Sequence, residues 1–267
     1  MSAAASAARL DLALVAAGLA PSREKAQALI LAGRVLIDGQ PGTKAGQKVA
    51  PGARLTLKPG KMYVSRAGDK LAGVLEPLGV DPQRLRCLDV GASTGGFTDV
   101  LLQRGASSVT AVDVGKGLID QSLRNDPRVR LLERVNARYL TPAMVDPPYD
   151  LITVDLSFIS LTLVLDALLP LAPDGHLLAM VKPQFEVGRG RVGAGGVVRD
   201  PDARAAAIEN VTRFLAARDW GILGLRASPV AGPKGNREVF VLAAGGPGLS
   251  EEILTRRIEE EVRRAPG

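Results

Sequence analysis

Two ionisable side chains stand at points where strand-like segments end. The stretch "DLITVDLSF" places Asp155 after one apolar run, and "LLAMVKPQFEVGRG" places Lys182 after another. In an open parallel sheet the carboxyl ends of the strands meet at one edge, and ligands bind in the crevice outside them. A carboxylate beside an amine at such an edge suits proton transfer or charge stabilisation, although lysines at strand ends are often only solvated.

A glycine-containing turn could hold a cofactor next to this pair. In "CLDVGASTGGFTDVLLQRGA", from Cys87 to Ala106, an apolar strand-like run leads into small residues and then a helix-like segment. Dinucleotides need Gly-x-Gly-x-x-Gly for the close approach of a pyrophosphate. Here Gly91 to Gly96 reads Gly-Ala-Ser-Thr-Gly-Gly, so the second fingerprint glycine is missing. The turn therefore favours S-adenosylmethionine over NAD.

The expected cofactor contacts follow from the chemistry of S-adenosylmethionine. Asp89 suits its cationic amino-acid end, Asp113 its ribose diol, and Asn136-Ala137 the edge of its adenine. NAD also uses an acid near the position of Asp113, so that residue alone does not discriminate between the two cofactors. The candidate contacts are Asp89, Gly91, Ser93, Thr94, Gly95, Phe97, Asp113, Asn136, Ala137 and Asp155.

Composition and motif position exclude several other chemistries. The chain has one cysteine and one histidine, so a His/Cys zinc centre is excluded and no metal is expected. Cys87 lies within a predicted strand, where it cannot serve as a nucleophile. Methylation of base amines commonly uses an Asn/Asp-Pro-Pro-Tyr/Phe motif after the fourth strand, but that position reads Asp155-Leu156-Ser157-Phe158. The literal "DPPY" at Asp146–Tyr149 precedes the fourth strand and should not reach the crevice.

The second part of the chain alternates strand-like and helix-like segments, which predicts a doubly wound α/β domain with a largely parallel sheet. The predicted strands are Leu85–Val90, Ser108–Asp113, Val129–Glu133, Leu151–Asp155, His176–Val181, Gly221–Ala227 and Glu238–Ala243. The predicted helices include Gly95–Gln103, Leu161–Leu169 and Ala203–Arg218, with a further helix from Leu249. Seven strands with a final antiparallel pair are typical of the Rossmann-like class I methyltransferase fold.

The charge of the chain is unevenly distributed. Residues 1–61 carry nine Lys and Arg against three acids, which accounts for the whole net charge of +6. This segment resembles the αL-motif RNA-binding domain named for ribosomal protein S4, in Arg9-Leu10-Asp11, Ser22-Arg23, Gly33 and Asp38-Gly39 among other positions. The resemblance implies that this module binds RNA. The candidate RNA contacts are Arg9, Arg23, Lys25, Arg34, Lys44 and Arg66.

These patterns predict an S4-type domain over residues 1–60, a linker over 61–64 and a methyltransferase domain over 65–267. Hydrophobic residues make up 46% of the chain, enough for a substantial core. An apolar run of about 18 residues, as a membrane span needs, does not occur. We expect a cytoplasmic protein that does not bind membranes.

Six ordered motifs together resemble the TlyA family of ribosomal RNA 2′-O-methyltransferases, whose catalytic domain is FtsJ-like and which are sometimes called haemolysins. The motifs are "SRAGDKL", "LDVGASTGGFTDVLLQRGA", "SLRNDPRV", "DLSFISL", "VKPQFEVGRG" and "GNREVF". The resemblance implies a Lys-Asp-Lys-Glu catalytic tetrad, which falls on Lys70, Asp155, Lys182 and Glu238. It also implies cytidines of small- or large-subunit ribosomal RNA as targets, and ribosomal subunits as partners.

Some points stay open at this level. A ribose hydroxyl is a poor nucleophile, and Lys182 could either remove its proton or stabilise the developing alkoxide as a cation. A membrane-active haemolysin and a non-catalytic RNA-binding protein are the alternative functions, and a dehydrogenase is a distant third. Leakage from liposomes would indicate the first alternative, and failure to bind S-adenosylmethionine would indicate the second.

The charge distribution predicts that RNA affinity resides largely in residues 1–61. Substituting Arg23→Ala together with Arg34→Ala should weaken RNA binding and flatten its salt dependence, by about one unit of log–log slope for each phosphate that is no longer neutralised. Binding of S-adenosylmethionine should be unaffected in the same protein. Titrations of ribosomal RNA at several salt concentrations test this, and an unchanged slope in the double variant would contradict it.

Overall fold

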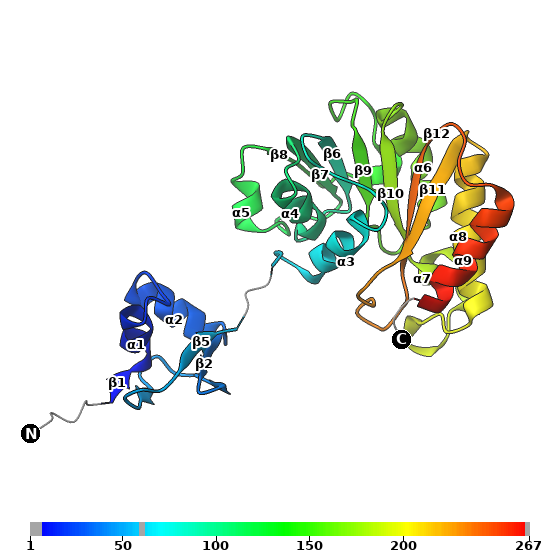
Figure 1. Cartoon of the computed structure of the whole chain (residues 1–267). Coiled ribbons are helices and arrows are strands. Elements are labelled where there is room, and N and C mark those ends of the chain that lie inside the picture. Colours follow the sequence, from blue (N-terminus) through cyan, green and yellow to red (C-terminus); the bar gives the residue numbers. More distant parts are fainter. Residues whose placement is uncertain (1–6, 59–61, 265–267) are drawn as a thin grey trace, which may run out of the picture. The chain divides into compact units, whose positions relative to one another are not determined.

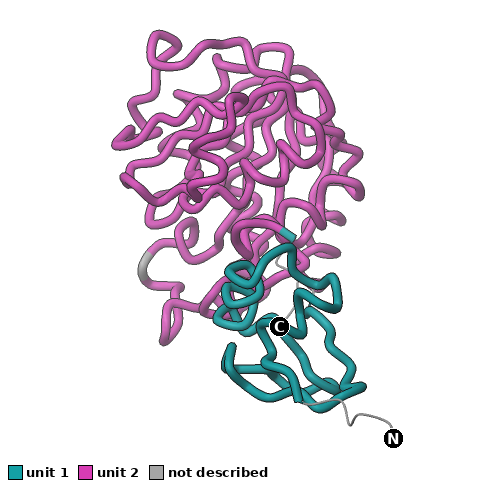
Figure 2. Tube along the Cα trace, turned by 90° about the vertical axis from the view of Figure 1, so that its left-hand side faces the viewer, with its two compact units in different colours: residues 1–62 teal, residues 63–267 magenta. Residues whose placement is uncertain are grey.

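The computed structural model describes residues 7–58 and 62–264, and the chain forms two compact units. The first comprises residues 1–62 and the second residues 63–267, as Figure 2 shows in two colours. Residues 59–61, part of the expected boundary, lie outside the described residues. Tyr63 is buried in the second unit, and the Val64 N–H donates a 2.8 Å hydrogen bond to Asp99 of that unit. The second unit therefore begins two residues before the expected start at residue 65.

The first unit is a small α/β module. Its elements are β1 (Ala8–Arg9), α1 (Leu10–Ala16), α2 (Arg23–Leu31), β2 (Val35–Ile37), β3 (Gln40–Pro41), β4 (Lys48–Val49) and β5 (Leu55–Leu57). As predicted, Ser22 caps α2, because its side chain accepts a hydrogen bond from the Lys25 N–H. The core forms where α1 and α2 present Leu10, Leu14 and Ile30 to the short strands.

The second unit alternates strands and helices along the chain (Figure 1). Its strands are β6 (Arg86–Val90), β7 (Ser108–Asp113), β8 (Val129–Glu133), β9 (Leu151–Val154), β10 (His176–Val181), β11 (Trp220–Ala227) and β12 (Val239–Gly245). Its α-helices are α3 (Arg66–Leu75), α4 (Gly96–Gln103), α5 (Gln121–Arg124), α6 (Leu165–Leu168), α7 (Pro183–Glu186), α8 (Pro201–Ala216) and α9 (Glu251–Arg264). Short 3₁₀ turns are η1 (Ala137–Tyr139), η2 (Leu161–Leu163), η3 (Leu169–Leu171), η4 (Arg189–Arg191) and η5 (Ala194–Gly196).

The seven strands form one sheet in the order β11-β12-β10-β9-β6-β7-β8. The pairs among β10, β9, β6, β7 and β8 are parallel, whereas β12 is antiparallel to both of its neighbours. This confirms the predicted class I methyltransferase arrangement with its final antiparallel pair. The carboxyl ends of β6, β7, β9 and β10 consequently lie along one edge, where a ligand site is expected.

The sheet is buried on both faces, because successive side chains point in opposite directions. Leu88 of β6 and Leu177 of β10 belong to a core shared with α6, α8 and α9. Cys87 and Leu178, one residue away in each strand, belong to the other core, shared with α3 and α4. The continuous apolar runs of these strands thus reflect a sheet covered on both sides.

The helix predicted over Leu161–Leu169 is not continuous. The segment from Leu161 to Leu169 is not a single helix but η2, α6 and η3 in succession. Val164 interrupts the helical backbone at φ −119°, and Pro170, which has no N–H to donate, follows in the last turn.

The "DPPY" segment lies where the sequence placed it. The Arg86 side chain at the start of β6 donates a 2.7 Å hydrogen bond to the Asp146 carbonyl, so the segment sits at the amino ends of the strands.

The sequence contained no apolar run long enough for a membrane span. Within residues 7–58 and 62–264, none of the helices has the length and apolar character to cross a membrane.

Candidate active site

A cavity of about 160 Å³ lies at the carboxyl edge of the sheet. The glycine turn after β6, the first turn of α3 and the residues that follow β9 and β10 form its wall. Six of the predicted site residues line it: Gly91, Ser93, Thr94, Phe97, Asp155 and Lys182. Ala67, Ala92 and Ser157 complete the lining. The cavity therefore brings the predicted cofactor turn and the predicted amine–carboxylate pair to one place.

Lys182 is the charged centre of the cavity. Its Nζ lies 2.5 Å from Asp155 Oδ1, and both side chains are largely buried. Nζ also donates a 2.9 Å hydrogen bond to Ser157 Oγ. Among the described residues, no donor reaches Asp155 Oδ1 with hydrogen-bond geometry, so the contact with Lys182 is ionic and only the contact with Ser157 is directional.

The other two residues of the predicted tetrad form a second ion pair. Lys70 Nζ donates a 2.5 Å hydrogen bond to Glu238 Oε2. Only 7% of Lys70 and 2% of Glu238 is exposed. Lys70 thus faces the protein interior and not solvent, because α3 turns that side chain towards the sheet. A buried amine and a buried carboxylate each leave an uncompensated charge if the partner is removed, so the two hold each other in place.

Strand register explains why the two pairs are neighbours. Val181 of β10 stands opposite Val239 of β12 in an antiparallel pair, so Lys182 and Glu238 occupy the next positions along the same edge. On the other side, β10 pairs with β9, the strand that ends just before Asp155. Adjacent strands are about 4.8 Å apart. Asp155, Lys182 and Glu238 therefore alternate in charge along the edge of the sheet.

Gly91 lets the glycine turn after β6 approach the end of β9. Its φ of +87° is in the left-handed region, and a Cβ there would stand 2.4 Å from the Asp155 carbonyl oxygen. Gly95 is equally constrained, because its φ is +93° and a Cβ there would collide with the Leu123 side chain. Both positions need glycine for the space as well as for the backbone conformation. The turn is therefore shaped as a close-fitting cradle, which suits a ligand bound through backbone groups.

Asp113 holds the glycine turn from the neighbouring strand. One carboxylate oxygen accepts a 2.8 Å hydrogen bond from the Ser93 N–H, and the other accepts a 2.6 Å hydrogen bond from the Gly115 N–H. A carboxylate has about four lone-pair directions, and Asp113 is only partly buried. It retains acceptor capacity for hydroxyl groups of a ligand.

Asp89 lies beneath the turn and does not line the cavity. It is fully buried, and its two oxygens accept hydrogen bonds from the Thr98 and Thr153 hydroxyls at 2.7 and 3.2 Å. Burial raises the pKa of Asp89 to about 7, and the nearby charge of Asp155 acts in the same direction, while the two hydroxyls oppose the shift. Its predicted contact with the amino-acid end of a cofactor stays a prediction.

The predicted adenine contacts lie in the turn that follows β8. The Asn136 side chain accepts a 3.0 Å hydrogen bond from the Arg138 N–H and so begins η1, in which Ala137 is buried. Neither residue lines the cavity described above. Their role in binding adenine also stays a prediction.

In the first unit, Asp11 brings two of the predicted RNA contacts together. Its buried carboxylate accepts hydrogen bonds from Arg9 at 3.0 Å and Arg23 at 2.9 Å. These hydrogen bonds hold the pKa of the carboxyl well below its usual range. Both guanidinium groups remain partly exposed. The other predicted contacts are spread over the two units: Lys25, Lys44 and Arg66 are exposed, and Arg34 is partly buried.

The sequence did not indicate Ala67, Ala92 and Ser157 as cavity residues, nor the exposure of Phe158. Phe158 follows Ser157 directly, is 91% exposed and adopts φ +67°, which is unusual for a bulky residue. Its ring lies 5.3 Å from that of Phe185, which belongs to the helix after Lys182. The quoted motifs "DLSF" and "VKPQF" contained both rings, but nothing in their spacing indicated that one would be exposed.

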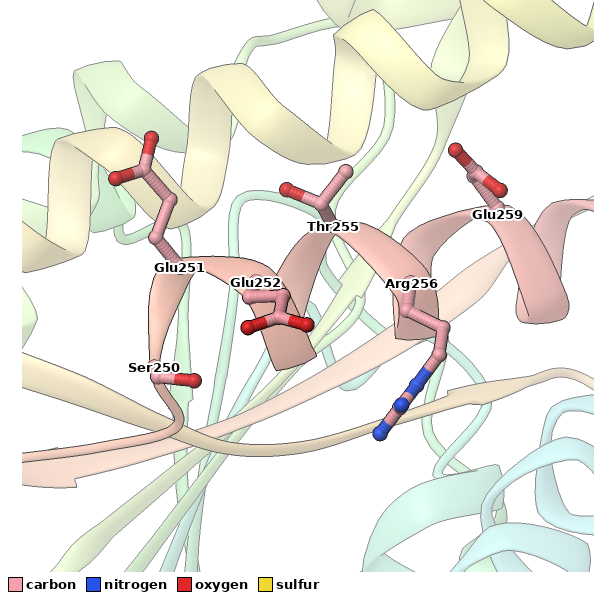
Figure 3. A pocket seen from close by; sticks show the side chains of 6 residues that line it. All are labelled: Ser250, Glu251, Glu252, Thr255, Arg256 and Glu259. Carbon is pink, nitrogen blue, oxygen red and sulfur yellow. The ribbon is translucent and has the colours of Figure 1, made fainter.

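A second hollow lies on another part of the second unit. It runs along the first turns of α9 and is lined by Ser250, Glu251, Glu252, Thr255, Arg256 and Glu259, as Figure 3 shows. None of these residues belongs to the predicted site. Within the described part of the chain, no group of three or more His, Cys, Asp or Glu side chains is placed to hold a metal ion.

Cys87 does not contribute to the site. Burial raises the pKa of its thiol to about 12. A thiol with such a pKa is almost entirely protonated at neutral pH and is a poor nucleophile, as the position of Cys87 in a strand predicted.

Comparisons with known proteins agree with this geometry. Residues 63–245 match the family of FtsJ-like methyltransferases, and residues 8–55 match the S4 domain. The chain is 50% identical over 261 residues to the "16S/23S rRNA (cytidine-2'-O)-methyltransferase TlyA" of Mycobacterium tuberculosis, covering 97% of each protein. It is 37% identical to "Hemolysin A" of Brachyspira hyodysenteriae over 86% of this chain and 97% of that protein.

A solved structure resembles the whole chain as well. It is described as "Putative hemolysin from Streptococcus thermophilus" and is 38% identical. The match has a TM-score of 0.73 and covers 97% of this chain and 95% of the other.

The buried carboxyl of Asp89 predicts a pH dependence of stability. Unfolded Asp has a pKa near 3.9, whereas folded Asp89 has a pKa of about 7. Between about pH 4 and pH 7 the folded state therefore binds a proton that the unfolded state does not. Asp89 should make the protein more stable as pH falls through this range, by about 1.4 kcal/mol per pH unit.

Denaturant unfolding of the wild type and of Asp89→Asn at several pH values tests this. Trp220 is the only tryptophan and is buried in the second unit, so its fluorescence reports on that unit. The difference in the free energy of unfolding between wild type and variant should change with this slope below pH 7 and level off above it. A difference that is independent of pH would show that Asp89 has an ordinary pKa.

Proposed function

The chain belongs to the FtsJ-like methyltransferases, within the TlyA family that joins this domain to an S4 domain, and we propose that Lys70, Asp155, Lys182 and Glu238 carry its methyl transfer to a ribose 2′-hydroxyl of ribosomal RNA. The observation that carries this proposal is the Lys182–Asp155 pair at 2.5 Å in the wall of the cavity beside the glycine turn. An amine in that position can meet a hydroxyl that enters the cavity.

We propose that S-adenosylmethionine is the methyl donor. When bound, it supplies a methyl group on a positively charged sulfur, which an oxygen nucleophile can displace. Gly91 provides the close-fitting backbone that such a ligand requires, and Asp113 retains free acceptor capacity beside the turn. The missing pyrophosphate fingerprint argues against NAD. The residues present therefore suit this cofactor.

Lys182 acts on the ribose hydroxyl. As that oxygen forms its new bond to carbon, the O–H bond must break, and the proton passes to the Lys182 amine or to solvent. In the first case the lysine is the general base. In the second, its ammonium stabilises the negative charge that grows on the oxygen. In both cases Asp155 balances the charge of the lysine while little water is present.

Lys70 and Glu238 support this chemistry from the next position along the edge. Glu238 holds the Lys70 ammonium at 2.5 Å and stands beside Lys182 in the strand register. The arrangement places two amines and two carboxylates in alternation, so the four side chains together carry no large net charge. We propose that Lys70 and Glu238 fix the electrostatic field around the ribose hydroxyl.

The remaining surfaces suit an RNA substrate. Phe158, which directly follows the cavity residue Ser157, exposes an aromatic ring, and unstacked bases of RNA commonly stack on such rings. The basic first unit offers Arg9 and Arg23, both held by Asp11, for phosphates. We place the reaction in the cytoplasm, on ribosomal RNA within subunits.

A non-catalytic RNA-binding protein remains the main alternative function. Burying four charged side chains beside an open cavity is costly, and a protein that only binds RNA would not require it. The haemolysin name belongs to the Brachyspira and Streptococcus proteins. Membrane activity of this chain would need an observation of its own.

The Asp113 assignment predicts the affinity for S-adenosylmethionine. Asp113→Ala should weaken binding by about 1.5–3 kcal/mol, the usual contribution of hydrogen bonds to a charged group, and NAD should not bind to either protein. Asp126→Ala is the matched control, because Asp126 also accepts a backbone hydrogen bond but lies before β8, at the opposite end of the strands. Calorimetric titration measures both, and equal affinity in the Asp113 and Asp126 variants would remove Asp113 from the cofactor site.

The assignment of Lys182 predicts a large drop in turnover. Lys182→Ala should lower kcat by about 10²–10⁴, the usual contribution of a positioned acid–base group, and binding of cofactor and RNA should stay within a few-fold. Lys182→Met keeps most of the side-chain length and should be equally slow. Lys182→Arg should not restore activity, because guanidinium does not deprotonate and has a different geometry. Near-normal methylation by a folded, RNA-binding Lys182→Ala protein would refute the mechanism.

A further inference from the structure

We propose that Ser157 is the positioning residue that sets the direction of the Lys182 amine. It lies within the quoted motif "DLSFISL", but the family resemblance assigns it no role. It is exposed, lines the cavity and accepts a 2.9 Å hydrogen bond from Lys182 Nζ. The inference rests on the proposed function of Lys182.

The two partners of Lys182 make different interactions with it, an ion pair and a hydrogen bond. Asp155 supplies charge at 2.5 Å, but its Oδ1 receives no hydrogen bond of good geometry from the described residues. Ser157 supplies the one directional contact. An ion pair tolerates many orientations of an amine, whereas a hydrogen bond prefers a nearly linear one. Ser157 is therefore the partner that can fix the rotation of the amine.

With one N–H directed to Ser157, the rotation of the amine is fixed. Besides this direction and the bond to Cε, the tetrahedral nitrogen has two others. In the ammonium both are N–H bonds, and in the neutral amine one of them is the lone pair. Because Lys182 lines the cavity, a ribose hydroxyl that enters it can meet one of these two directions, whichever role the lysine plays.

The loop that carries Ser157 is held at both ends. On the near side, the Asp155 N–H donates a 2.9 Å hydrogen bond to the Val90 carbonyl of β6. On the far side, Glu186 of α7 accepts hydrogen bonds from the Ser160 hydroxyl at 2.6 Å and the Leu161 N–H at 2.8 Å. The same α7 begins directly after Lys182. The hydroxyl and the amine are thus carried by segments that are tied to each other, as a preorganised contact requires.

The first test compares Ser157→Ala with Ser157→Thr. Removing the hydroxyl should lower kcat by about 10- to 100-fold, as expected for one hydrogen bond to an amine that acts in the transition state. KM for RNA and calorimetric affinity for S-adenosylmethionine should change less than about three-fold. Ser157→Thr keeps the hydroxyl at an exposed position with room for a methyl group, and should restore most of kcat.

Two control variants separate positioning from loop structure. Ser160→Ala removes a hydroxyl three residues further along the same loop, whose partner is Glu186 and not Lys182. Ser107→Ala removes an exposed hydroxyl that donates a 2.9 Å hydrogen bond at the start of β7. Ser160→Ala should reduce kcat less than Ser157→Ala does, and Ser107→Ala should match the wild type. Equal reductions in the Ser157 and Ser160 variants would overturn the proposal in favour of general loosening of the loop.

A double-variant cycle gives the sharpest outcome. If Ser157 acts only through the Lys182 amine, then Ser157→Ala combined with Lys182→Ala should be no slower than Lys182→Ala alone. Reductions in kcat that multiply would overturn the proposal. A fast Lys182→Ala protein would instead refute the proposed function itself, whereas a slow Lys182→Ala with a fast Ser157→Ala would refute only the role of Ser157.

Discussion

The site depends on the alternation of charge along one edge of the sheet. Lys182 pairs with Asp155, which follows β9, and Lys70 pairs with Glu238, which precedes β12 and stands next to Lys182 in the strand register. Buried charges of this kind are stable only when each is paired, so none of the four can be removed without cost to its neighbours. The pairing exists because β9 ends and β12 begins beside the end of β10. A slip of one residue would turn these side chains to the opposite face.

Sequence patterns predicted the strands well and the contacts between distant residues poorly. The strands Ser108–Asp113, Val129–Glu133 and His176–Val181 have the predicted bounds. His176–Val181 is apolar after its first residue because it is buried on both faces, whereas Val129–Glu133 lies at the edge of the sheet and is only partly buried. The segment 161–169 was harder, because its leucines fit a helix while Val164 and Pro170 break one. Helical periodicity identifies the apolar face of a segment, but it does not show where the backbone is interrupted.

In the candidate site, too, the sequence did not show which distant residues come into contact. Asp155 and Lys182 could be predicted as neighbours, since both end strands, whereas Lys70 and Glu238 lie 168 positions apart and were placed only through the family resemblance. Asp89 looked like a ligand contact because it ends a strand beside the turn. The structure buries it between two threonine hydroxyls, and sequence does not reveal which way such a side chain turns. Ser157 lies within the quoted motif "DLSFISL", but the sequence does not show its contact with Lys182, which follows another strand.

The central claim is that the methyl group goes to ribose oxygen and not to a base. Ribosomal RNA that lacks the modification can be incubated with the full chain and S-adenosylmethionine carrying an isotopically heavy methyl group, then digested to nucleosides. Mass spectrometry then shows whether the heavy methyl fragments with the sugar or with the base. We expect a single class of product, with the label on the ribose of cytidine, formed about 10²–10⁴ times more slowly when Lys182 is replaced by alanine. Label on a base, or no label with a protein that binds both cofactor and RNA, would contradict it.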